Sequence, residues 1–196
     1  MAILERGFKA WAERTARSLR GELELREDEA LDLAALAQVL GVRLITPLEV
    51  SGISKQTLGA LLDEDPSGWS AVSVTSSERA LVIFNPRHSK ARQASDIAHE
   101  LAHFVLNHEP SKLVVSPDGQ IVMRSYNSKQ EEEANWLAWS LLVPREALLE
   151  ARRRKMSTAE IARMYQVSEA LVTFRMGVTG IRILEARGRL KFSGPR

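Results

Sequence analysis

Two histidines and a glutamate near the middle of the chain are spaced for metal-assisted hydrolysis. His99, Glu100 and His103 form an HExxH motif within residues 89–106, a run whose pattern predicts one long helix. Side chains four positions apart stack on one helical face, so both imidazoles can bind one metal ion while Glu100 lies beside the water that the ion holds. The motif therefore predicts a metal-dependent hydrolase.

The helix that carries this motif has two chemically different faces. Its apolar side chains fall within one arc of about 120°, and they are Ile97, Ala98, Leu101, Phe104 and Val105. His99 and His103 lie on the other side with Asp96 and Glu100, where an exposed helix would more often mix Lys, Arg and Glu. We therefore favour a metal site over the alternative of two solvated histidines on a surface helix.

Catalytic zinc usually takes three protein ligands and keeps a fourth position for water, so a third ligand is needed. A later histidine, as in HExxHxxGxxH, is disfavoured because Leu106 and Glu109 occupy its Gly and His positions. The other common solution is a glutamate on a later helix, and residues 131–133 are three successive glutamates. On a helix over about residues 129–143, Glu131 shares its face with small residues, which would let the two helices approach closely.

Glu131 is the predicted third ligand. Asn135, one turn further on, is predicted to hydrogen-bond a ligand histidine. Asp96, one turn before His99, either orients a ligand imidazole or faces solvent. The alternative for Glu131 is a capping box with Ser128, in which its carboxylate would bond the backbone at the start of the helix.

Glu100 is the predicted catalytic residue. As general base it would take a proton from a metal-activated water that attacks a peptide carbonyl, and it would then pass that proton to the leaving amine. The ligand types favour Zn²⁺, while Mn²⁺ or Fe²⁺ could occupy the same site in vitro. His88, His108 and Tyr126 carry donors that could stabilise an oxyanion, and the alternative for each is a surface or packing role.

Helical and strand patterns along the chain predict an α+β fold, a compact zinc-peptidase domain with a small mixed or antiparallel sheet packed on the HExxH helix. We expect helices at about residues 4–19, 29–40, 57–62 (capped by Ser54), 89–106, 129–143, 158–164 and 169–176. Strands are expected at 42–45, 69–75, 80–84, 113–115, 120–124, 181–184 and 189–192. A single domain would span 1–196, with its core at about 30–150 and a helix-turn-helix-like segment at about 156–177 packed on it.

Composition and charge narrow the class of protein. The formal net charge of +2 over 196 residues is too small to indicate a nucleic-acid partner by itself. The absence of cysteine excludes disulfides and thiolate metal sites. Residues 1–20 carry charges throughout and lack the apolar core of a secretory signal, and no apolar stretch is long enough to cross a bilayer. We therefore expect a cytoplasmic protein with no membrane partner.

Two separated patterns resemble the ImmA/IrrE metallopeptidase family: residues 95–103, and Glu131-x-x-Ala134-Asn135-x-x-Ala138 leading to Pro144. Looser similarity extends over about residues 30–180. The resemblance implies a zinc-peptidase domain with His99, His103 and Glu131 as ligands and Glu100 as base. It also implies a regulatory protease that cleaves a helix-turn-helix repressor and so relieves repression of mobile-element or DNA-damage-response genes. Leu137 and the Arg175-Met176 pair depart from the usual residues of that family.

Two rival functions fit parts of the sequence. Residues 158–176 have helix-turn-helix spacing, with Gln166 where such turns commonly prefer Gly, and the basic run 152–155 precedes them. A DNA-binding regulator would use Thr173 and Arg175 toward base edges, although we expect this segment to pack on the peptidase core. The third possibility is a catalytically idle metal-bound scaffold that recognises a partner protein.

Overall fold

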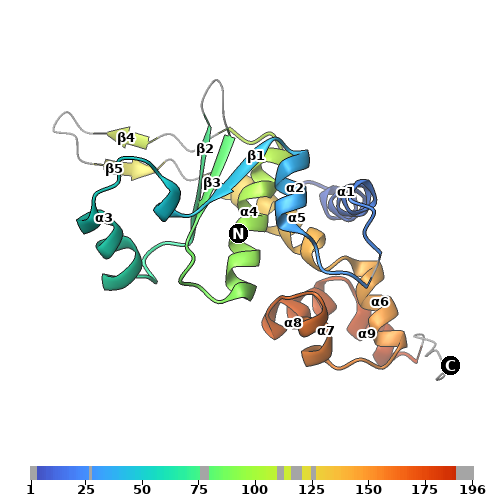
Figure 1. Ribbon diagram of the computed structural model, residues 1–196. Helices are drawn as coiled ribbons and strands as arrows, with labels where there is room; N and C mark the ends of the chain where they lie inside the picture. The colour runs from blue at the N-terminus through green and yellow to red at the C-terminus, as the bar shows by residue number, and fades with distance from the viewer. Residues whose placement is uncertain are drawn as a thin grey trace.

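The computed structural model describes residues 4–26, 28–75, 80–109, 113–115, 121–124 and 127–188. Its elements form an α+β arrangement in which α6 to α9 gather at one end of the molecule (Figure 1). Their order is α1 (Phe8–Glu22), α2 (Leu33–Val39), β1 (Val42–Ile45), the 3-10 turn η1 (Pro47–Glu49), α3 (Lys55–Gly59), the π-helical turn η2 (Ala60–Glu64), β2 (Ala71–Thr75), β3 (Ala80–Phe84), α4 (Lys90–Val105), β4 (Leu113–Val115), β5 (Ile121–Arg124), α5 (Ser128–Leu142), α6 (Arg145–Arg153), α7 (Thr158–Met164), α8 (Glu169–Val178) and α9 (Ile181–Ala186).

The main sheet has three strands in the order β1-β3-β2 and is mixed, one of the two arrangements that the sequence leaves open. β2 and β3 pair antiparallel, with Ala71 opposite Phe84. β1 pairs parallel with β3, which places Val42 opposite Ala80, and the long connection that parallel strands require runs here through η1, α3, η2 and β2. β4 and β5 form a separate antiparallel pair. The turn expected between those two strands at residues 117–119, and residue 120 of the second expected strand, lie outside the described residues.

Helix α4 packs between the sheet and α5, because it contacts β2 and β3 as well as α5. Its buried side chains include Ile97, Ala98, Leu101 and Ala102, so the predicted apolar face is the face that enters the core. The facing helix α5 buries Ala134, Leu137, Ala138 and Leu141. Alanines on both helices let the two backbones approach closely, which brings the polar edges of α4 and α5 together.

Local signals at helix ends explain several element boundaries. Asp32 caps α2 by accepting hydrogen bonds from the backbone N–H groups of Ala34 and Ala35, and Gly41 follows the helix with a φ of 68°. Ser54 accepts from the N–H of Thr57 at the start of α3, which confirms the predicted cap. Among the described residues, the structure contains no helix both long and apolar enough to cross a membrane.

The C-terminal part differs from the prediction in two places. Residues 145–153, which we left unassigned, form α6. Residues 181–184, which we expected to be a strand, belong to α9, where Ile181 is buried and Ile183 is exposed. The strand expected at 189–192 lies outside the described residues. One cluster of buried apolar side chains includes Ala12 of α1 and Ile181 of α9, while the single domain over 1–196 stays a prediction.

Candidate metal centre

Helix α4 presents the two motif histidines on its polar edge, opposite the buried Ile97 and Leu101. The helix begins where Ser89 accepts a hydrogen bond from the N–H of Arg92. The Nε2 atoms of His99 and His103 lie 3.1 Å apart. Both imidazoles are therefore directed at one point beside α5.

Glu131 completes a group of three donors. Its carboxylate Oε2 lies 3.1 Å from His99 Nε2, and its Oε1 lies 3.8 Å from His103 Nε2. The start of α5 is capped by Asn127, whose side chain accepts from the N–H groups of Lys129 and Gln130. The capping box that we weighed for Ser128 and Glu131 is therefore not the cap of this helix, and the Glu131 side chain reaches across to α4 instead.

The spacing of these donors fits a small divalent cation. The ligand atoms of His99, His103 and Glu131 lie within 4.8 Å of one another. Four ligands at about 2.0–2.1 Å in a tetrahedron lie about 3.3 Å apart, close to the 3.1 Å that separates His99 Nε2 from both His103 Nε2 and Glu131 Oε2. Two imidazole nitrogens and a carboxylate oxygen are also the donor types that zinc takes in proteins.

His99 is oriented by an amide from α5. Its Nδ1 lies 3.0 Å from Oδ1 of Asn135, the residue that the sequence placed beside a ligand histidine. A carbonyl oxygen only accepts, so this hydrogen bond favours the tautomer in which His99 Nδ1 carries the proton and Nε2 keeps its lone pair for a metal ion. The hydrogen bond therefore presents the nitrogen that faces Glu131 in the form that binds metal.

His103 has a different supporting group. Its Nδ1 lies 2.9 Å from Nδ1 of His108, and His108 Nε2 lies 3.3 Å from Oε2 of Glu133. Burial, and next the nearby imidazoles of His99 and His108, lower the pKa of His103 from 6.5 to about 3. His103 is therefore neutral at physiological pH, as a metal ligand must be.

The sequence pattern does not predict this arrangement of His108 and Glu133. It marks His108 as a candidate oxyanion donor and favours Glu131 over Glu133 as the third ligand. The signal was Asn107, which takes a left-handed φ of 51° just after α4 and is a residue type that tolerates this conformation. The turn at Asn107 brings the following residue back over the helix end.

Glu100 and Asp96 occupy the same side of α4 as the ligands. The Glu100 side chain is half-buried, and by helical geometry it projects about 60° from His103 and about 100° from His99. Asp96 bonds His88, with 3.2 Å between Oδ2 and Nδ1, and lies 3.8 Å from Arg92 Nε. Asp96 thus pairs with His88 and Arg92, which matches neither of its two expected roles, orienting a ligand imidazole or facing solvent.

The other two oxyanion candidates have different outcomes. His88 is engaged by Asp96 and, through Nε2, by the carbonyl oxygen of Pro66 at 3.1 Å. It therefore ties the loop before β2 to the first turns of α4. Tyr126 lies outside the described residues.

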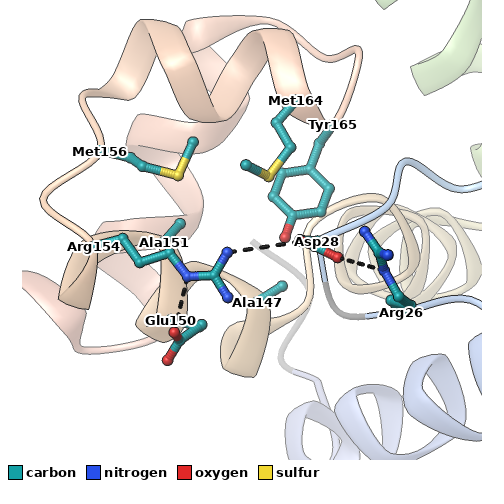
Figure 2. A pocket seen from close by; sticks show the side chains of 9 residues that line it. All are labelled: Arg26, Asp28, Ala147, Glu150, Ala151, Arg154, Met156, Met164 and Tyr165. Atoms are coloured by element: carbon teal, nitrogen blue, oxygen red, sulfur yellow. Dashed lines mark hydrogen bonds and ion pairs between the residues drawn. The ribbon is translucent and has the colours of Figure 1, made fainter. Parts of the chain in front are cut away.

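A cavity of about 430 Å³ lies among the segment before α2 and helices α6 and α7 (Figure 2). Its lining comes from the segment before α2, from α6 and from α7: Arg26, Asp28, Ala147, Glu150, Ala151, Arg154, Met156, Met164 and Tyr165. The charged groups in it are paired with one another, since Arg154 contacts both Glu150 and Asp28, and Arg26 contacts Asp28. None of the residues proposed for metal-dependent chemistry lines it.

The helix-turn-helix-like segment is formed by α7 and α8, joined by residues 165–167. Arg175, which the DNA-binding alternative would need at base edges, is fully buried and donates from Nε to the carbonyl oxygen of Val143 at 3.0 Å. Arg152 is paired with Glu185, and Arg153 with Glu150. The burial of Arg175 disfavours the DNA-binding hypothesis, because that side chain cannot reach a base edge.

An α+β fold with an HExxH helix packed on a carboxylate-bearing helix defines a metallopeptidase-type protein. Consistently, residues 37–176 match the family described as Peptidase M78, IrrE N-terminal-like domain. The match spans most of the chain, so the chain belongs to this peptidase family, and the resemblance to ImmA/IrrE peptidases is confirmed. No curated protein matches the sequence.

Proposed function

We propose that this chain is a zinc-dependent endopeptidase whose ligands are His99, His103 and Glu131. The observation that carries the proposal is the convergence of these three donors from α4 and α5, whose ligand atoms all lie within 4.8 Å of one another. Two nitrogens and one oxygen leave one position of a tetrahedral zinc site open, as catalytic sites require. Membership of a peptidase family supports the same assignment.

In this proposal Glu100 moves the proton. The chemistry that a bound Zn²⁺ supplies is polarisation of a peptide carbonyl and a lowered pKa of water. The Glu100 carboxylate accepts a proton from the attacking water and donates it to the nitrogen of the leaving amine, so that the peptide C–N bond breaks. Asn135 holds His99 in the tautomer that keeps Nε2 free for the ion.

The proposed substrate is a helix-turn-helix repressor, and its cleavage would relieve repression of mobile-element or DNA-damage-response genes. The support is the match of residues 37–176 to the IrrE N-terminal-like domain family, together with the resemblance of the two motifs to ImmA/IrrE peptidases. Direct binding of nucleic acid is no part of the proposal, since the buried Arg175 cannot reach a DNA groove.

The experiment that tests this function compares wild type with Glu100→Gln, which removes the base but leaves the three ligands in place. Each protein is expressed in the same cells, and new protein N-termini are labelled and identified by mass spectrometry. We expect termini that appear with wild type alone and that fall within a helix-turn-helix protein. Identical termini with both proteins would exclude proteolysis by this site. If the termini specific to wild type fall only in other kinds of protein, a helix-turn-helix repressor is excluded as the substrate.

Metal content gives the companion measurement. The purified wild type should carry about one equivalent of zinc, and folded His99→Ala and Glu131→Ala variants should carry none. A wild type that takes up no metal when Zn²⁺ is added would overturn the proposal. DNA binding would then be tested with the residues of α7 and α8.

A further inference from the structure

A second imidazole lies directly behind the ligand His103. His108 comes just after α4, and its Nδ1 lies 2.9 Å from Nδ1 of His103. This is the ring nitrogen that points away from Glu131, since His103 Nε2 is the atom near His99 and Glu131. His108 therefore contacts the metal-distal side of the ligand ring.

The end of α4 is built to place His108 there. The N–H of His108 donates to the carbonyl oxygen of His103 at 3.0 Å, and the N–H of Asn107 donates to that of Phe104 at 3.1 Å. With Asn107 in the left-handed region at a φ of 51°, these two bonds form a Schellman motif. The motif reverses the chain so that the ring of His108 folds back over the ring of His103.

Glu133 supports His108 from α5. Its Oε2 lies 3.3 Å from His108 Nε2, and the side chains of His108 and Glu133 are only 8% and 13% exposed. Lys129 lies 3.9 Å from the other carboxylate oxygen of Glu133. A mostly buried carboxylate is a strong acceptor for the His108 N–H.

The positions of the protons on His108 and His103 follow from the Glu133 carboxylate, the last group in the hydrogen-bonded series His103–His108–Glu133. The Glu133 carboxylate only accepts, so His108 Nε2 carries its proton and His108 Nδ1 is left with a lone pair. That lone pair accepts from His103 Nδ1, which therefore carries the proton of the neutral His103 ring. His103 Nε2 then has its lone pair directed at the point where the ligand atoms converge.

We propose that His108 and Glu133 are positioning residues for the metal ligand His103, fixing its tautomer and ring orientation through two successive hydrogen bonds. This inference rests on the proposed metal site. The two ligand histidines are thus supported differently, His99 by the neutral amide of Asn135 and His103 by an imidazole backed with a carboxylate. Polarisation by Glu133 makes the His103 nitrogen a more basic donor to the ion.

The test measures Zn²⁺ affinity by competition with a chromophoric chelator, using variants matched in size. His108→Leu removes the acceptor from His103, whereas His108→Asn keeps one, because an asparagine Oδ1 occupies the place of a histidine Nδ1. We expect His108→Leu to bind zinc about 10- to 100-fold more weakly than wild type. His108→Asn should recover most of that loss, a rescue that a role in packing alone would not produce.

Glu133→Gln and Glu132→Gln form a second matched pair, since each removes one negative charge from α5 at neighbouring positions about 100° apart around the helix. Glu133→Gln should weaken zinc binding and change the visible spectrum of the Co²⁺-loaded protein, because the ligand His103 is reoriented. Glu132→Gln should change neither. Circular dichroism confirms that each variant is folded before it is compared.

The outcomes separate this inference from the proposed function. A wild type that binds no Zn²⁺ overturns the metal site and this inference with it. A wild type that binds one equivalent, with His108→Leu and Glu133→Gln equal to it in affinity and Co²⁺ spectrum, overturns the positioning role and leaves the metal site standing. Equal losses in His108→Leu and His108→Asn would also overturn it, because they would show that the acceptor atom is not what matters.

Discussion

The amide oxygen of Asn135 lies 3.0 Å from Nδ1 of His99, joining two residues that are 36 positions apart in the chain. The contact links α5 to the ring that carries one metal-binding nitrogen. It exists because α4 and α5 pack closely through alanines such as Ala98 and Ala134, both fully buried. Because the two helices pack closely, Asn135 can form this hydrogen bond, and the bond favours the His99 tautomer whose Nε2 is free to bind a metal ion.

Replacing this amide should weaken metal binding. Asn135→Leu keeps the size of the side chain but leaves the His99 N–H without its acceptor, and we expect zinc affinity to fall by about 10- to 100-fold. Asn135→Asp retains an acceptor oxygen, so its affinity should equal or exceed that of wild type. Isothermal titration with Zn²⁺ gives both values, and equal affinities for Asn135→Leu and wild type would contradict the role assigned to Asn135.

Metal binding should also stabilise the fold. The ligands come from two helices that separate on unfolding, so an ion that binds only the folded chain adds about 2.7 kcal/mol to the free energy of unfolding when its concentration is 100 times the dissociation constant. Urea unfolding with added zinc and with a chelator measures the difference. His99→Ala should show the same stability in both conditions, and a wild type indifferent to zinc would contradict the prediction.

Removing Arg175 should destabilise the protein strongly. Its side chain is 0% exposed and pairs with Glu13 of α1 at 2.5 Å, and Glu13 also accepts from the N–H of Arg145. Arg175→Met would leave the Glu13 carboxylate without its cation in a largely buried place, which costs about 3–5 kcal/mol of unfolding free energy. Urea unfolding measures this loss.

A surface arginine in the same region is the matched control. Arg182 of α9 is exposed, so Arg182→Met should change the unfolding free energy by no more than about 0.5 kcal/mol. The double variant Arg175→Met with Glu13→Leu should lose less than Arg175→Met alone, because no buried charge is left unpaired. If Arg175→Met unfolds at the same urea concentration as wild type, the ion pair between Arg175 and Glu13 does not hold α1 and α8 together.

The parts of the candidate metal centre set by single helices could be predicted from the sequence. The spacing of His99 and His103 and the position of Asn135 one turn after Glu131 depend only on helical periodicity. On α4 the apolar face that includes Ile97 and Leu101 is buried, so the opposite face, with His99 and His103, is the polar one. For these residues the local pattern and the tertiary packing require the same arrangement.

The parts that depend on chain reversals could not be predicted in this way. His108 and Glu133 are 25 positions apart, and their contact follows from the left-handed turn at Asn107, which helical periodicity does not describe. Residues 181–183 alternate apolar and charged side chains, a pattern typical of a strand, yet burial of Ile181 in α9 overrides it. Likewise, the sequence alone predicts an exposed Arg175, because its partner Glu13 lies 162 positions away in the chain.

The turn between α7 and α8 stores local backbone strain at Gln166. This residue has a φ of 54°, in the left-handed region where a Cβ atom is crowded. Its N–H donates to the carbonyl oxygen of Arg163, and the N–H of Val167 donates to that of Ala162, so the geometry is that of a helix C-terminus that favours glycine. The segment keeps the turn despite the unfavourable residue, because Val167 and Val172 are buried.

Substitutions at Gln166 should therefore order by how well each residue tolerates a positive φ. Gln166→Gly should raise the unfolding free energy by about 0.5–1 kcal/mol, the relief of strain being partly offset by the greater freedom of glycine in the unfolded chain. Gln166→Asn should lie between glycine and wild type, and Gln166→Val should lower the free energy by about 1 kcal/mol or more, since a β-branched side chain is the worst fit. Urea unfolding of the four proteins gives the order. Equal stabilities for the valine and glycine variants would mean that the turn relaxes to another conformation, whereas the expected order would show that packing of α7 and α8 holds Gln166 in place against its own preference.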